Sequence, residues 1–521
     1  MTTSSESTWP SESSEPTRLT AAVIVLAAGG GTRMKSRRSK LLHELAGRPI
    51  IAHAIDAAEK LESEHLVVVV GVMADQVEPA LQQIAPNVQI VHQTEDAYGT
   101  GHAVRCAIHE LGELRGEVVV TTGDTPMLSG ETLLRFVQEH RSGRNALTVL
   151  TARVPDPTGY GRIVRNQDGQ VLRIVEHKDA AADELAIDEI NSGVFVFDAD
   201  VLVQGLAQLT TKNAQGEYYL TDLPQIVQQL GHRIGAYVTE DLWEVEGVNN
   251  RVQLAAMSRE MNRRICERWM LDGVTIADPA TTWIHADVDL APDVTLLPGT
   301  SLEGATTVGS GSVIGPDTTL LDVEVGENAT VSRTHGSLAV IGAEASVGPF
   351  AYLRPGTVLD AGGKIGTFVE TKNARIGRGA KVPHLTYAGD AEIGEGANIG
   401  AGTIFANYDG VEKNHSSVGR HSFIGSDSVL VAPVRVGDGA YVAAGSAITD
   451  DVAAGELGIA RGRQHNSPGW VARKRPGTKS AAVAADADQH ADHDADQNAD
   501  PDGGPTAGPT TTGVPDTDVV D

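Results

Sequence analysis

The chain contains few residues of the kinds that cross-link secreted proteins or anchor chains in membranes. Only two of its 521 residues are cysteines, Cys106 and Cys266, and they form no CxxC pair. Two separated thiols are typical of a reducing compartment and argue against a disulfide framework. Hydrophobic residues make up 41% of the chain, but no apolar run is long enough to predict a membrane span. The N-terminal segment lacks the apolar core of a signal peptide, so we expect a cytoplasmic protein without membrane attachment.

Basic residues are also scarce relative to acidic ones. Lys and Arg total 41 against 69 Asp and Glu, which gives a formal net charge of −28. Such a charge argues against nonspecific binding to nucleic acid. Part of it comes from the segment after Lys479, which holds ten Asp and no Lys or Arg. This composition cannot bury a core, and we predict disorder over residues 476–521 and over the polar residues 1–20.

Between residues 20 and 250, short apolar runs alternate with amphipathic stretches. Strands that alternate with helices predict a mostly parallel, Rossmann-like α/β sheet with helices on both faces. Ligands of such sheets bind beyond the carboxyl ends of the strands, where the segments LAAGGGTR (26–33) and TTGDTP (121–126) are predicted to lie. The predicted strands are 22–28, 65–71, 88–93, 117–124, 146–154 and 193–200, and the predicted helices include 49–61, 73–85, 101–114 and 130–141.

The first of these segments carries three successive glycines followed by basic residues. Gly30 and Gly31 let backbone amides approach a phosphate, and Arg33 and Lys40 can hold its charge. The spacing is not that of a P-loop, and Met34 stands where a dinucleotide fingerprint needs its last glycine. A plain strand-to-helix turn whose basic side chains are solvated is also compatible with this sequence. The loop alone therefore does not decide between a phosphate site and an ordinary turn.

The pattern changes after residue 272. Residues 250–272 are predicted to form a connecting helix with an apolar stripe at Met257, Met261, Ile265 and Trp269, which is more typical of packing than of a site. Beyond it, an aliphatic residue followed by glycine recurs, often at a spacing of six. This repeat predicts a parallel β-helix in which the aliphatic side chain fills the axis and the glycine lets the chain turn. The aliphatic members are Val308, Ile314, Val325, Ile341, Val347, Ile365, Ile376, Ile393, Ile399, Val418, Ile424 and Val436.

Longer motifs from both halves occur together in this chain. The first half carries LAAGGGTRM, GTGHAV, PTGYGRIVR, IVEHKDA, EINSGVF and EGVNN, and the second carries HLTYAGDAEIGEGANIGAGTIFANYDG. Over about residues 21–475 the chain closely resembles the bacterial bifunctional N-acetylglucosamine-1-phosphate uridyltransferases and glucosamine-1-phosphate acetyltransferases. The resemblance implies a uridyltransferase domain at 21–249, a left-handed β-helix acetyltransferase domain at 273–475, and a homotrimer whose acetyltransferase sites form where subunits meet.

For the first domain, the resemblance implies that UTP and N-acetylglucosamine-1-phosphate give UDP-N-acetylglucosamine and pyrophosphate. Arg33 and Lys40 are then expected to hold the phosphates, and Asp124 and Asn249 to bind Mg²⁺, which prefers oxygen ligands. Ser39 stands where the family usually has proline before the lysine. The other expected contacts are Leu26, Ala27, Ala28 and Gly29 around the nucleotide, Gln93, Gly99 and Thr100 at the uracil, and Gly161, Glu176 and Asn191 at the sugar.

For the second domain, the resemblance implies acetyl transfer from acetyl-CoA to the amine of glucosamine-1-phosphate. An ammonium cannot attack a thioester, so a base must remove its proton, and His384 matches the family's base. The basic segment 461–477 either meets the phosphates of coenzyme A or is a solvated end of the domain. Arg354, Lys372, Tyr387 and Asn398 match the sugar-phosphate contacts, and Ala401, Asn407, Tyr408, Ser426, Ala444 and Arg461 match the acetyl-CoA contacts.

Two alternatives share this domain plan. One is a single-activity sugar-1-phosphate nucleotidyltransferase whose β-helix only assembles or regulates, as in glucose-1-phosphate adenylyltransferases. The other is a non-catalytic subunit with a decayed first domain. A scaffold needs neither His384 nor Lys372, and a decayed domain would not keep Lys40, Asp124 and Asn249, so the sequence favours two activities.

Overall fold

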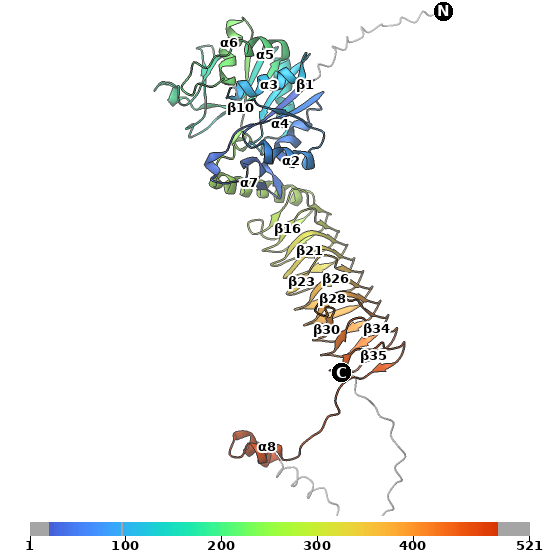
Figure 1. Cartoon of the computed structure of the whole chain (residues 1–521). Helices are drawn as coiled ribbons and strands as arrows, with labels where there is room; N and C mark the ends of the chain where they lie inside the picture. The colour runs from blue at the N-terminus through green and yellow to red at the C-terminus, as the bar shows by residue number, and fades with distance from the viewer. Residues whose placement is uncertain (1–19, 95–96, 488–521) are drawn as a thin grey trace, which may run out of the picture. The chain divides into compact units, whose positions relative to one another are not determined.

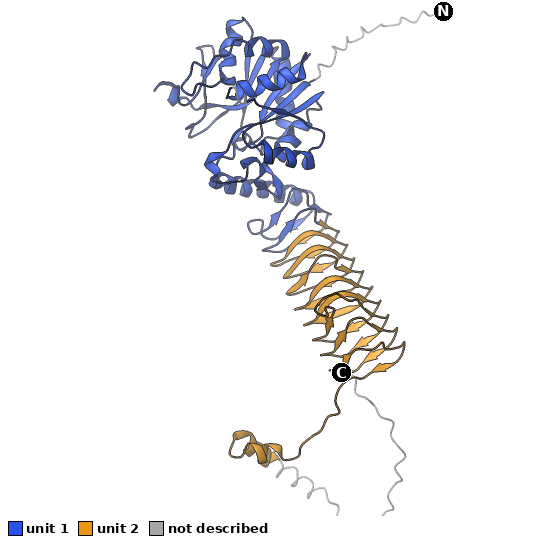
Figure 2. Ribbon diagram, viewed as in Figure 1, with its two compact units in different colours: residues 1–292, 296–306 blue, residues 293–295, 307–521 orange. Residues whose placement is uncertain are grey.

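The computed structural model describes residues 20–94 and 97–487, which fall into two compact units (Figure 2). Unit 1 extends to Pro292 and includes Leu296–Thr306, and unit 2 comprises Asp293–Thr295 and the residues from Thr307 onwards. The first strands of the predicted β-helix domain therefore group with unit 1. Of the two segments predicted to be disordered, only residue 20 and residues 476–487 lie within the described part, and residues 479–487 are helical. None of the helices described is long and apolar enough to cross a membrane.

Unit 1 is built on a mixed sheet whose main path runs β11-β7-β10-β6-β1-β4-β5. The last four strands of this path are parallel to one another and coincide closely with predicted apolar runs. They are β1 (Thr20–Ala27), β4 (His65–Val70), β5 (Gln89–His92) and β6 (Glu117–Thr122). Because β1 and β6 are parallel neighbours, the two segments predicted to bind ligand emerge side by side, and Gly123 N donates to Leu26 O at 2.9 Å.

The other side of the sheet contains the antiparallel strand that makes it mixed. This strand, β10 (Glu189–Asp198), lies antiparallel between β6 and β7 (Leu147–Arg153). The sheet also includes three strands that the sequence did not predict, β8 (Arg162–Arg165), β9 (Val171–Val175) and β11 (Ile234–Thr239). A separate short hairpin, β2 (Glu44–Leu45) with β3 (Arg48–Pro49), follows the loop that carries Lys40.

Alternate residues of the central strands point to opposite faces, and each face has its own buried core. On one face Ile24, Val67 and Val120 pack with the apolar residues of α3, α5 and α6, and on the other Val23 and Val68 pack with those of α1, α2 and α4. Helices therefore cover both sides of the sheet, as predicted (Figure 1). They are α1 (Ile50–Glu59), α2 (Ala74–Ile84), α3 (Thr100–Leu111), α4 (Gly130–Ser142), α5 (Ala199–Leu206) and α6 (Leu223–Gln229).

The predicted connecting helix is α7 (Arg251–Leu271). It begins at Asn250, whose side chain accepts hydrogen bonds from the backbone N–H groups of Val252 and Gln253. Its stripe is packing, as expected: Met257, Ile265 and Trp269 are buried. Buried Asn262 fixes the helix against the following chain, because it donates to Thr282 O at 2.8 Å and accepts from Ile284 N at 3.0 Å. The strands that follow in unit 1 include β12 (Thr275–Ile276), β13 (Trp283–Ile284), β14 (Asp289–Leu290) and β16 (Ser301–Glu303).

Unit 2 is a coil of short parallel strands arranged in three ladders. The first ladder is β18 (Val313–Ile314), β20 (Thr330–Val331), β22 (Ser346–Val347), β25 (Lys364–Thr367), β27 (Lys381–His384), β29 (Asn398–Ile399), β32 (Phe423–Ile424), β35 (Tyr441–Val442) and β37 (Leu457–Gly458). Four longer strands belong to both other ladders and bend at a residue with positive φ in their middle. They are β19 (Thr319–Val325), β21 (Thr334–Ile341), β26 (Glu370–Ile376) and β28 (Tyr387–Ile393).

The remaining strands complete the second and third ladders. The second ladder continues with β23 (Ala351–Leu353), β30 (Ile404–Ala406), β33 (Val429–Val431) and β36 (Ala447–Ile448). The third includes β17 (Thr307–Val308), β24 (Val358–Leu359), β31 (Ser416–Val418) and β34 (Val434–Val436). A short helix, α8 (Trp470–Lys474), follows the coil.

The hexapeptide prediction is confirmed in its main point and corrected in one detail. All twelve aliphatic residues of the repeat are buried, with exposed fractions of 5% or less. Ten of the twelve glycines that follow these residues, however, are required for close approach to a neighbouring coil rather than for turning, and only Gly315 and Gly348 have positive φ. At Gly425, for example, a Cβ atom would lie 2.4 Å from the backbone N of Ala444 in the next coil. The corners are made by other residues with positive φ, such as Asn328 and Asp427. The left hand of the coil stays a prediction.

Candidate functional site

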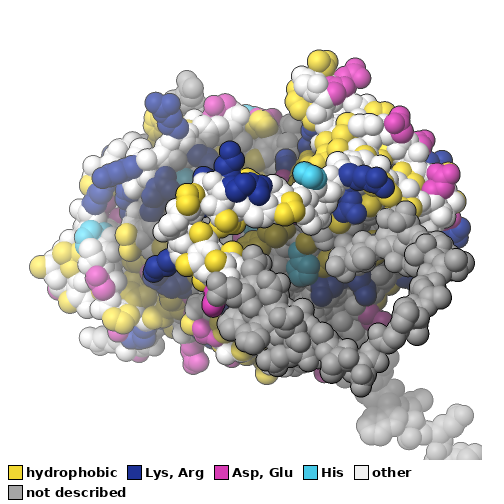
Figure 3. Space-filling model, turned by 90° about the horizontal axis from the view of Figure 1, so that it is seen from below, with side chains coloured by type: hydrophobic (Ala, Val, Ile, Leu, Met, Phe, Trp, Pro, Cys, Tyr) yellow, Lys and Arg dark blue, Asp and Glu magenta, His cyan; other side chains and the backbone are white. Residues whose placement is uncertain are grey.

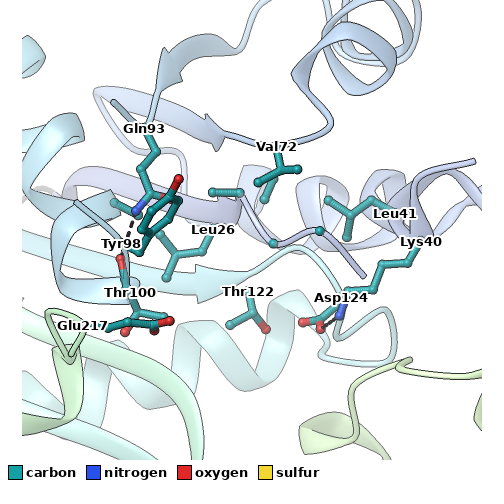
Figure 4. A pocket seen from close by; sticks show the side chains of 16 residues that line it. Leu26, Lys40, Leu41, Val72, Gln93, Tyr98, Thr100, Thr122, Asp124 and Glu217 are labelled. Carbon is teal, nitrogen blue, oxygen red and sulfur yellow. Dashed lines mark hydrogen bonds and ion pairs between the residues drawn. The ribbon is translucent and has the colours of Figure 1, made fainter. Parts of the chain in front are cut away.

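A cavity of about 410 Å³ opens beyond the carboxyl ends of β1 and β6 in unit 1 (Figure 4). Its wall includes every predicted nucleotide contact from Leu26 to Gly29, together with Lys40, Asp124 and the predicted uracil segment. The residues of the wall are Leu26, Ala27, Ala28, Gly29, Gly30, Lys40, Leu41, Val72, Gln93, Tyr98, Gly99, Thr100, Ala103, Thr122, Asp124 and Glu217. The structure thus brings together two segments that lie about 70 residues apart in the sequence.

The glycine-rich loop is shaped around the side chain of Lys40. Gly31 has a φ of 58°, a left-handed conformation that other residues rarely adopt. A Cβ atom there would lie 3.0 Å from Cβ of Lys40, so a larger residue would displace the lysine. Gly29, by contrast, faces open space within the cavity wall. The loop therefore leaves room for a ligand on one side and supports Lys40 on the other.

Four of the predicted polar residues converge at one end of the cavity. Lys40 Nζ forms an ion pair with Asp124 and lies 3.3 Å from Asn249 Oδ1, and Arg33 donates to the same oxygen at 2.7 Å. Asn249 directly precedes the cap of α7, and its backbone N donates to Gln253 Oε1 at 3.0 Å. The backbone N of Val248 donates to Asp124 O at 2.9 Å, which ties the EGVNN segment to the TTGDTP segment. The start of α7 thus places Asn249 opposite Asp124.

The oxygens of Asp124 and Asn249 fit a Mg²⁺ ion. Both already surround a cationic group, the ammonium of Lys40. Among residues 20–94 and 97–487 there is no cluster of three or more His, Cys, Asp or Glu side chains that would hold a metal by itself. One carboxylate and one amide oxygen are a typical protein contribution for Mg²⁺ when phosphate and water supply the remaining ligands.

The three residues predicted to contact the sugar lie together beside β8. Asn191 N donates to Gly161 O at 2.9 Å, and a Cβ atom on Gly161 would lie 3.6 Å from Glu176 Oε1. Glu176 accepts from the hydroxyl of Thr221 at 2.9 Å, and burial raises the pKa of its carboxyl group. Burial, followed by the charges of Glu246 and Asp124, raises the pKa of the hydroxyl of neighbouring Tyr160. The effect of Asp124 shows that Tyr160 lies near this carboxylate. The sugar cluster is therefore close to the charged end of the cavity.

The predicted sugar-phosphate contacts of the acetyltransferase lie on the second ladder of unit 2. Arg354 follows β23 and donates to Glu370 Oε1 at 2.8 Å, and Lys372 and Tyr387 lie on the adjoining strands β26 and β28. Lys413, which the sequence did not predict, lies against Lys372. A hydrogen bond from Lys413 and the charge of that lysine lower the pKa of Lys372. Three cations on one exposed surface are suited to a phosphate.

Asp390 organises this surface from the corner of β28. It accepts from Asn373 at 2.7 Å and from Asn407 at 2.5 Å, and Asn407 is buried. Burial raises the pKa of Asp390, but these two bonds and the charges of Lys413 and Lys372 outweigh burial and lower it overall. Tyr408, next to Asn407, is 59% exposed. In the predicted Asn407-Tyr408 pair, Asn407 is therefore held in place, while Tyr408 projects into solvent.

The remaining predicted residues lie on a different face of the same chain. His384 and Asn398 belong to β27 and β29 of the first ladder, and His384 is exposed. Ala401, Ser426 and Ala444 precede successive corners with positive φ, at Gly402, Asp427 and Gly445. Arg461 donates to Ala444 O at 2.8 Å. Asn398 therefore does not lie on the ladder that carries Arg354, Lys372 and Tyr387.

The basic segment 461–477 is almost entirely exposed and contains α8. The view from below shows Lys and Arg side chains at the surface among apolar ones (Figure 3). The structure places Arg461 beside Ala444.

Several residues that complete these sites were missed from the sequence. They are Val72, Tyr98, Thr122 and Glu217 in the cavity wall, Thr221 beside Glu176, and Lys413 beside Lys372. None belongs to a spacing pattern with chemical meaning of its own. The lysines Lys372 and Lys413 are 41 residues apart and meet only because the coils stack.

The first unit has an α/β sheet with helices on both faces and a glycine-rich loop suited to phosphate, and a coil of hexapeptide repeats follows it. These features define the class of a nucleotidyltransferase joined to a hexapeptide-repeat domain. Comparisons with protein families agree: residues 23–183 match the MobA-like NTP transferase domain, and residues 416–450 match the hexapeptide repeat of succinyl-transferase. The chain is 57% identical over 469 residues to "Bifunctional protein GlmU" of Kineococcus radiotolerans, covering 90% of this chain and 95% of that protein. It is 55% identical over 471 residues to the protein of the same name from Streptomyces avermitilis, covering 90% and 98%. The chain belongs to the family of the bifunctional GlmU proteins.

Proposed function

We propose that unit 1 transfers a uridylyl group from UTP to N-acetylglucosamine-1-phosphate and that unit 2 transfers an acetyl group from acetyl-CoA to glucosamine-1-phosphate. The product of the second reaction is the sugar phosphate used by the first, so one chain would make UDP-N-acetylglucosamine, the activated sugar of cell-envelope precursors. The observation that carries the proposal is the cluster of Lys40, Arg33, Asp124 and Asn249 at the end of a nucleotide-sized cavity.

In the uridylyl transfer, a phosphate oxygen of the sugar phosphate attacks the α-phosphorus of UTP. The bond from the α-phosphorus to the bridging oxygen breaks, and pyrophosphate leaves with the electron pair. The attacking oxygen is already anionic, so no base is needed, and the protein contributes position and charge. Lys40 and Arg33 neutralise the phosphates, while the small residues from Ala27 to Gly29 let the nucleotide approach the backbone.

Asp124 and Asn249 would hold Mg²⁺, which neutralises charge on the triphosphate when it is bound. Asp124 and Asn249 share Lys40 as a partner in the structure. We therefore expect Lys40 to leave these oxygens and turn towards phosphate when the substrates are bound. At the other end of the substrate, Gly161, Glu176 and Asn191 would fix the sugar.

In the acetyl transfer, His384 would take a proton from the ammonium of glucosamine-1-phosphate. The free amine attacks the thioester carbonyl carbon, a C–N bond forms and the C–S bond breaks, and the thiolate of coenzyme A takes up the second proton that the nitrogen loses as it becomes an amide. Arg354, Lys372 and Lys413 would bind the sugar phosphate. The repulsion between Lys372 and Lys413 supports this assignment, because a phosphate dianion between the two lysines would relieve it. Asn407, Tyr408 and Arg461, together with Ala401, Ser426 and Ala444, would hold acetyl-CoA.

We further propose that the acetyltransferase site is completed by a second copy in a homotrimer. Asn398 lies on the first ladder, and the cationic surface lies on the second, so one chain does not present them on one face. An apolar column beside His384 supports a protein neighbour: Phe350, Phe368 and Leu385 are 54%, 58% and 60% exposed, and the two Phe rings stack at 5.4 Å. Exposed apolar surface of this kind is typical of an interface.

The uridyltransferase proposal is tested by pyrophosphate release from UTP and N-acetylglucosamine-1-phosphate in the presence of Mg²⁺. Asp124→Asn should abolish most of this activity and leave thiol release from acetyl-CoA unchanged. A variant that keeps normal pyrophosphate release would remove Asp124 from the mechanism. We also propose a cytoplasmic location, and the two free cysteines support it because unpaired thiols are typical of a reducing compartment.

A further inference from the structure

The uracil end of the cavity is backed by a buried histidine that the reaction does not use. His102 in α3 is 6% exposed, and its ring stacks on that of Tyr218, with centroids 6.3 Å apart. Its Nδ1 lies 3.3 Å from Gln93 Nε2. Its Nε2 lies 3.4 Å from Thr94 Oγ1 and 3.9 Å from Cys106 Sγ. The ring is therefore held on both sides while one nitrogen faces Gln93.

The neighbours of Gln93 fix which way round its amide group lies. The carbonyl oxygen of Gly99 can only accept a hydrogen bond, so the Gln93 atom 3.1 Å away must be the amide nitrogen (Figure 4). The second hydrogen of that nitrogen points to His102 Nδ1. His102 Nδ1 must then accept, which places the ring proton on Nε2, where it faces Thr94.

This arrangement determines what Gln93 presents to a nucleobase. Both amide hydrogens are directed at protein acceptors, so the polar atom that remains is the carbonyl oxygen Oε1. Within the described residues Oε1 has no protein hydrogen-bond partner, and Gln93 forms part of the cavity wall beside Tyr98 and Thr100. An acceptor at this position matches the N3–H donor of uracil. It opposes cytosine, whose N3 is itself an acceptor.

The position of Gly99 is also fixed, which makes the amide orientation rigid. Gly99 has a φ of 109°, and a Cβ atom on it would lie 2.3 Å from Tyr218 O. Tyr218 N donates to Tyr98 O at 2.9 Å, and Gly101 N donates to Tyr218 O at 2.9 Å. The chain on both sides of Gly99 is thus bonded to Tyr218, the residue on which His102 stacks. His102, Gly99 and Tyr218 form one support beneath Gln93.

We propose that His102 is a positioning residue that favours uracil over cytosine, because its Nδ1 accepts a second hydrogen bond that reinforces the amide orientation of Gln93 set by Gly99. The inference rests on the proposed uridylyl transfer and assigns its base specificity to a residue that contacts no substrate. Without the acceptor at His102 Nδ1, only the hydrogen bond to Gly99 O keeps the amide group of Gln93 from turning over. A flipped amide presents an NH₂ group that cytosine N3 can accept from, so discrimination should fall.

The test compares kcat/KM for pyrophosphate release with UTP and with CTP, at saturating N-acetylglucosamine-1-phosphate and Mg²⁺. His102→Phe keeps a ring that can stack on Tyr218 but lacks the acceptor, and the UTP-to-CTP ratio should fall about tenfold. His102→Asn offers its side-chain oxygen as an acceptor near the Nδ1 position and should restore most of the ratio. Thiol release by unit 2 and the melting temperature monitor folding in each variant.

A purely structural role for His102 predicts a different result. Loss of packing alone would lower both kcat/KM values by the same factor and leave their ratio unchanged, which would overturn the inference. If His102→Phe does not fold, Thr94→Val takes its place. Loss of the Thr94 hydroxyl disfavours the His102 tautomer that carries its proton on Nε2 and leaves Nδ1 as an acceptor, so the UTP-to-CTP ratio of Thr94→Val should fall about threefold. If the wild-type chain releases no pyrophosphate from UTP, the proposed function fails as well. If it does and no variant changes the ratio, only this inference fails.

Discussion

At the scale of single residues, Lys40 is central to the proposed uridyltransferase site, because this side chain contacts both oxygens proposed to bind metal. Its aliphatic part lies against Gly31, and its ammonium contacts Asp124 and Asn249. A single side chain thus joins the loop after β1, the loop after β6 and the start of α7. Ser39, which replaces the family's usual proline, is buried, and its N–H donates to Gln76 Oε1 at 2.9 Å. This bond holds the backbone before Lys40 in place of a proline ring.

Replacing Lys40 with alanine should therefore affect one activity only. We expect Lys40→Ala to lower kcat for pyrophosphate release by about 10² to 10³, the usual effect of removing one group that stabilises developing charge. Thiol release by unit 2 should stay within about twofold of wild type, since unit 2 has its own core. Arg37→Ala is the matched control, because Arg37 is an exposed cation of the same loop that contacts neither Asp124 nor Asn249. Equal losses in both variants would mean that general loop charge, rather than Lys40, supports catalysis.

The two cysteines should differ in reactivity. Cys266 is fully buried in α7, and burial raises the pKa of its thiol to about 11. Because the thiolate is the reactive form, Cys266 should resist alkylation at pH 8 in the folded protein. Cys106 is partly exposed. Mass spectrometry after iodoacetamide treatment should find modified Cys106 before modified Cys266, and both after unfolding. Rapid native labelling of Cys266 would show that α7 does not pack as described.

At the scale of elements, α7 connects the proposed metal site to the strands that follow it. Its first residues fix Asn249, and its middle is bonded to the chain near β13 through Asn262. On its exposed side, Glu260 receives bonds from Arg263 and Arg264, and Arg264 also pairs with Asp241. The hydrogen bond from Arg263 is the largest influence on the pKa of Glu260, and burial, which opposes it, is the second. Together with the hydrogen bond from Arg264 and the charges of both arginines, the bond from Arg263 outweighs burial and lowers the pKa to about 2.

This shift predicts how the stability of unit 1 depends on pH. A carboxyl group whose pKa falls on folding stabilises the folded state above its unfolded pKa, 4.5 here, and the stabilisation is lost as pH falls towards 2. Glu260→Gln should therefore lower the free energy of unfolding by about 1 kcal/mol at pH 7, because the pair is near the surface, and by almost nothing near pH 2. Glu267→Gln, which alters a more exposed pair with Arg263, should have a smaller effect. Urea unfolding from pH 3 to 7 measures both variants, and a difference that does not vary with pH would contradict the linkage.

The sequence predicted the elements better than their contacts. The central strands and α1 to α4 were found within a few residues, because long apolar runs and amphipathic periods are local signals. The buried positions of the coil were predicted for the same reason. By contrast, β8 and β9 are short and half-polar, and Lys413 meets Lys372 only through the stacking of coils. The glycines of the repeat were interpreted as turn residues, because sequence does not show how closely neighbouring coils approach.

At the scale of the whole molecule, we assign separate reactions to the two units and propose that neighbouring subunits meet at the acetyltransferase site. Co-expression of Lys372→Ala and Asn398→Ala chains tests the joining. Each homotrimer should be nearly inactive in thiol release, but the co-expressed population should regain about a quarter of wild-type activity, because random assembly pairs an intact Lys372 with an intact Asn398 at about that frequency. Pyrophosphate release should be normal throughout and serves as the control. Mixed trimers no more active than either parent would show that both residues serve from the same chain.

The central claim is that one chain carries out acetylation and uridylylation in that order. The most direct measurement supplies glucosamine-1-phosphate, UTP and Mg²⁺, adds acetyl-CoA, and follows free thiol and pyrophosphate separately in wild type, His384→Ala and Asp124→Ala. We predict thiol release first and pyrophosphate after a lag in wild type, neither product in His384→Ala, and thiol alone in Asp124→Ala. Pyrophosphate release that starts without acetyl-CoA, or thiol release that survives in His384→Ala, would contradict the account.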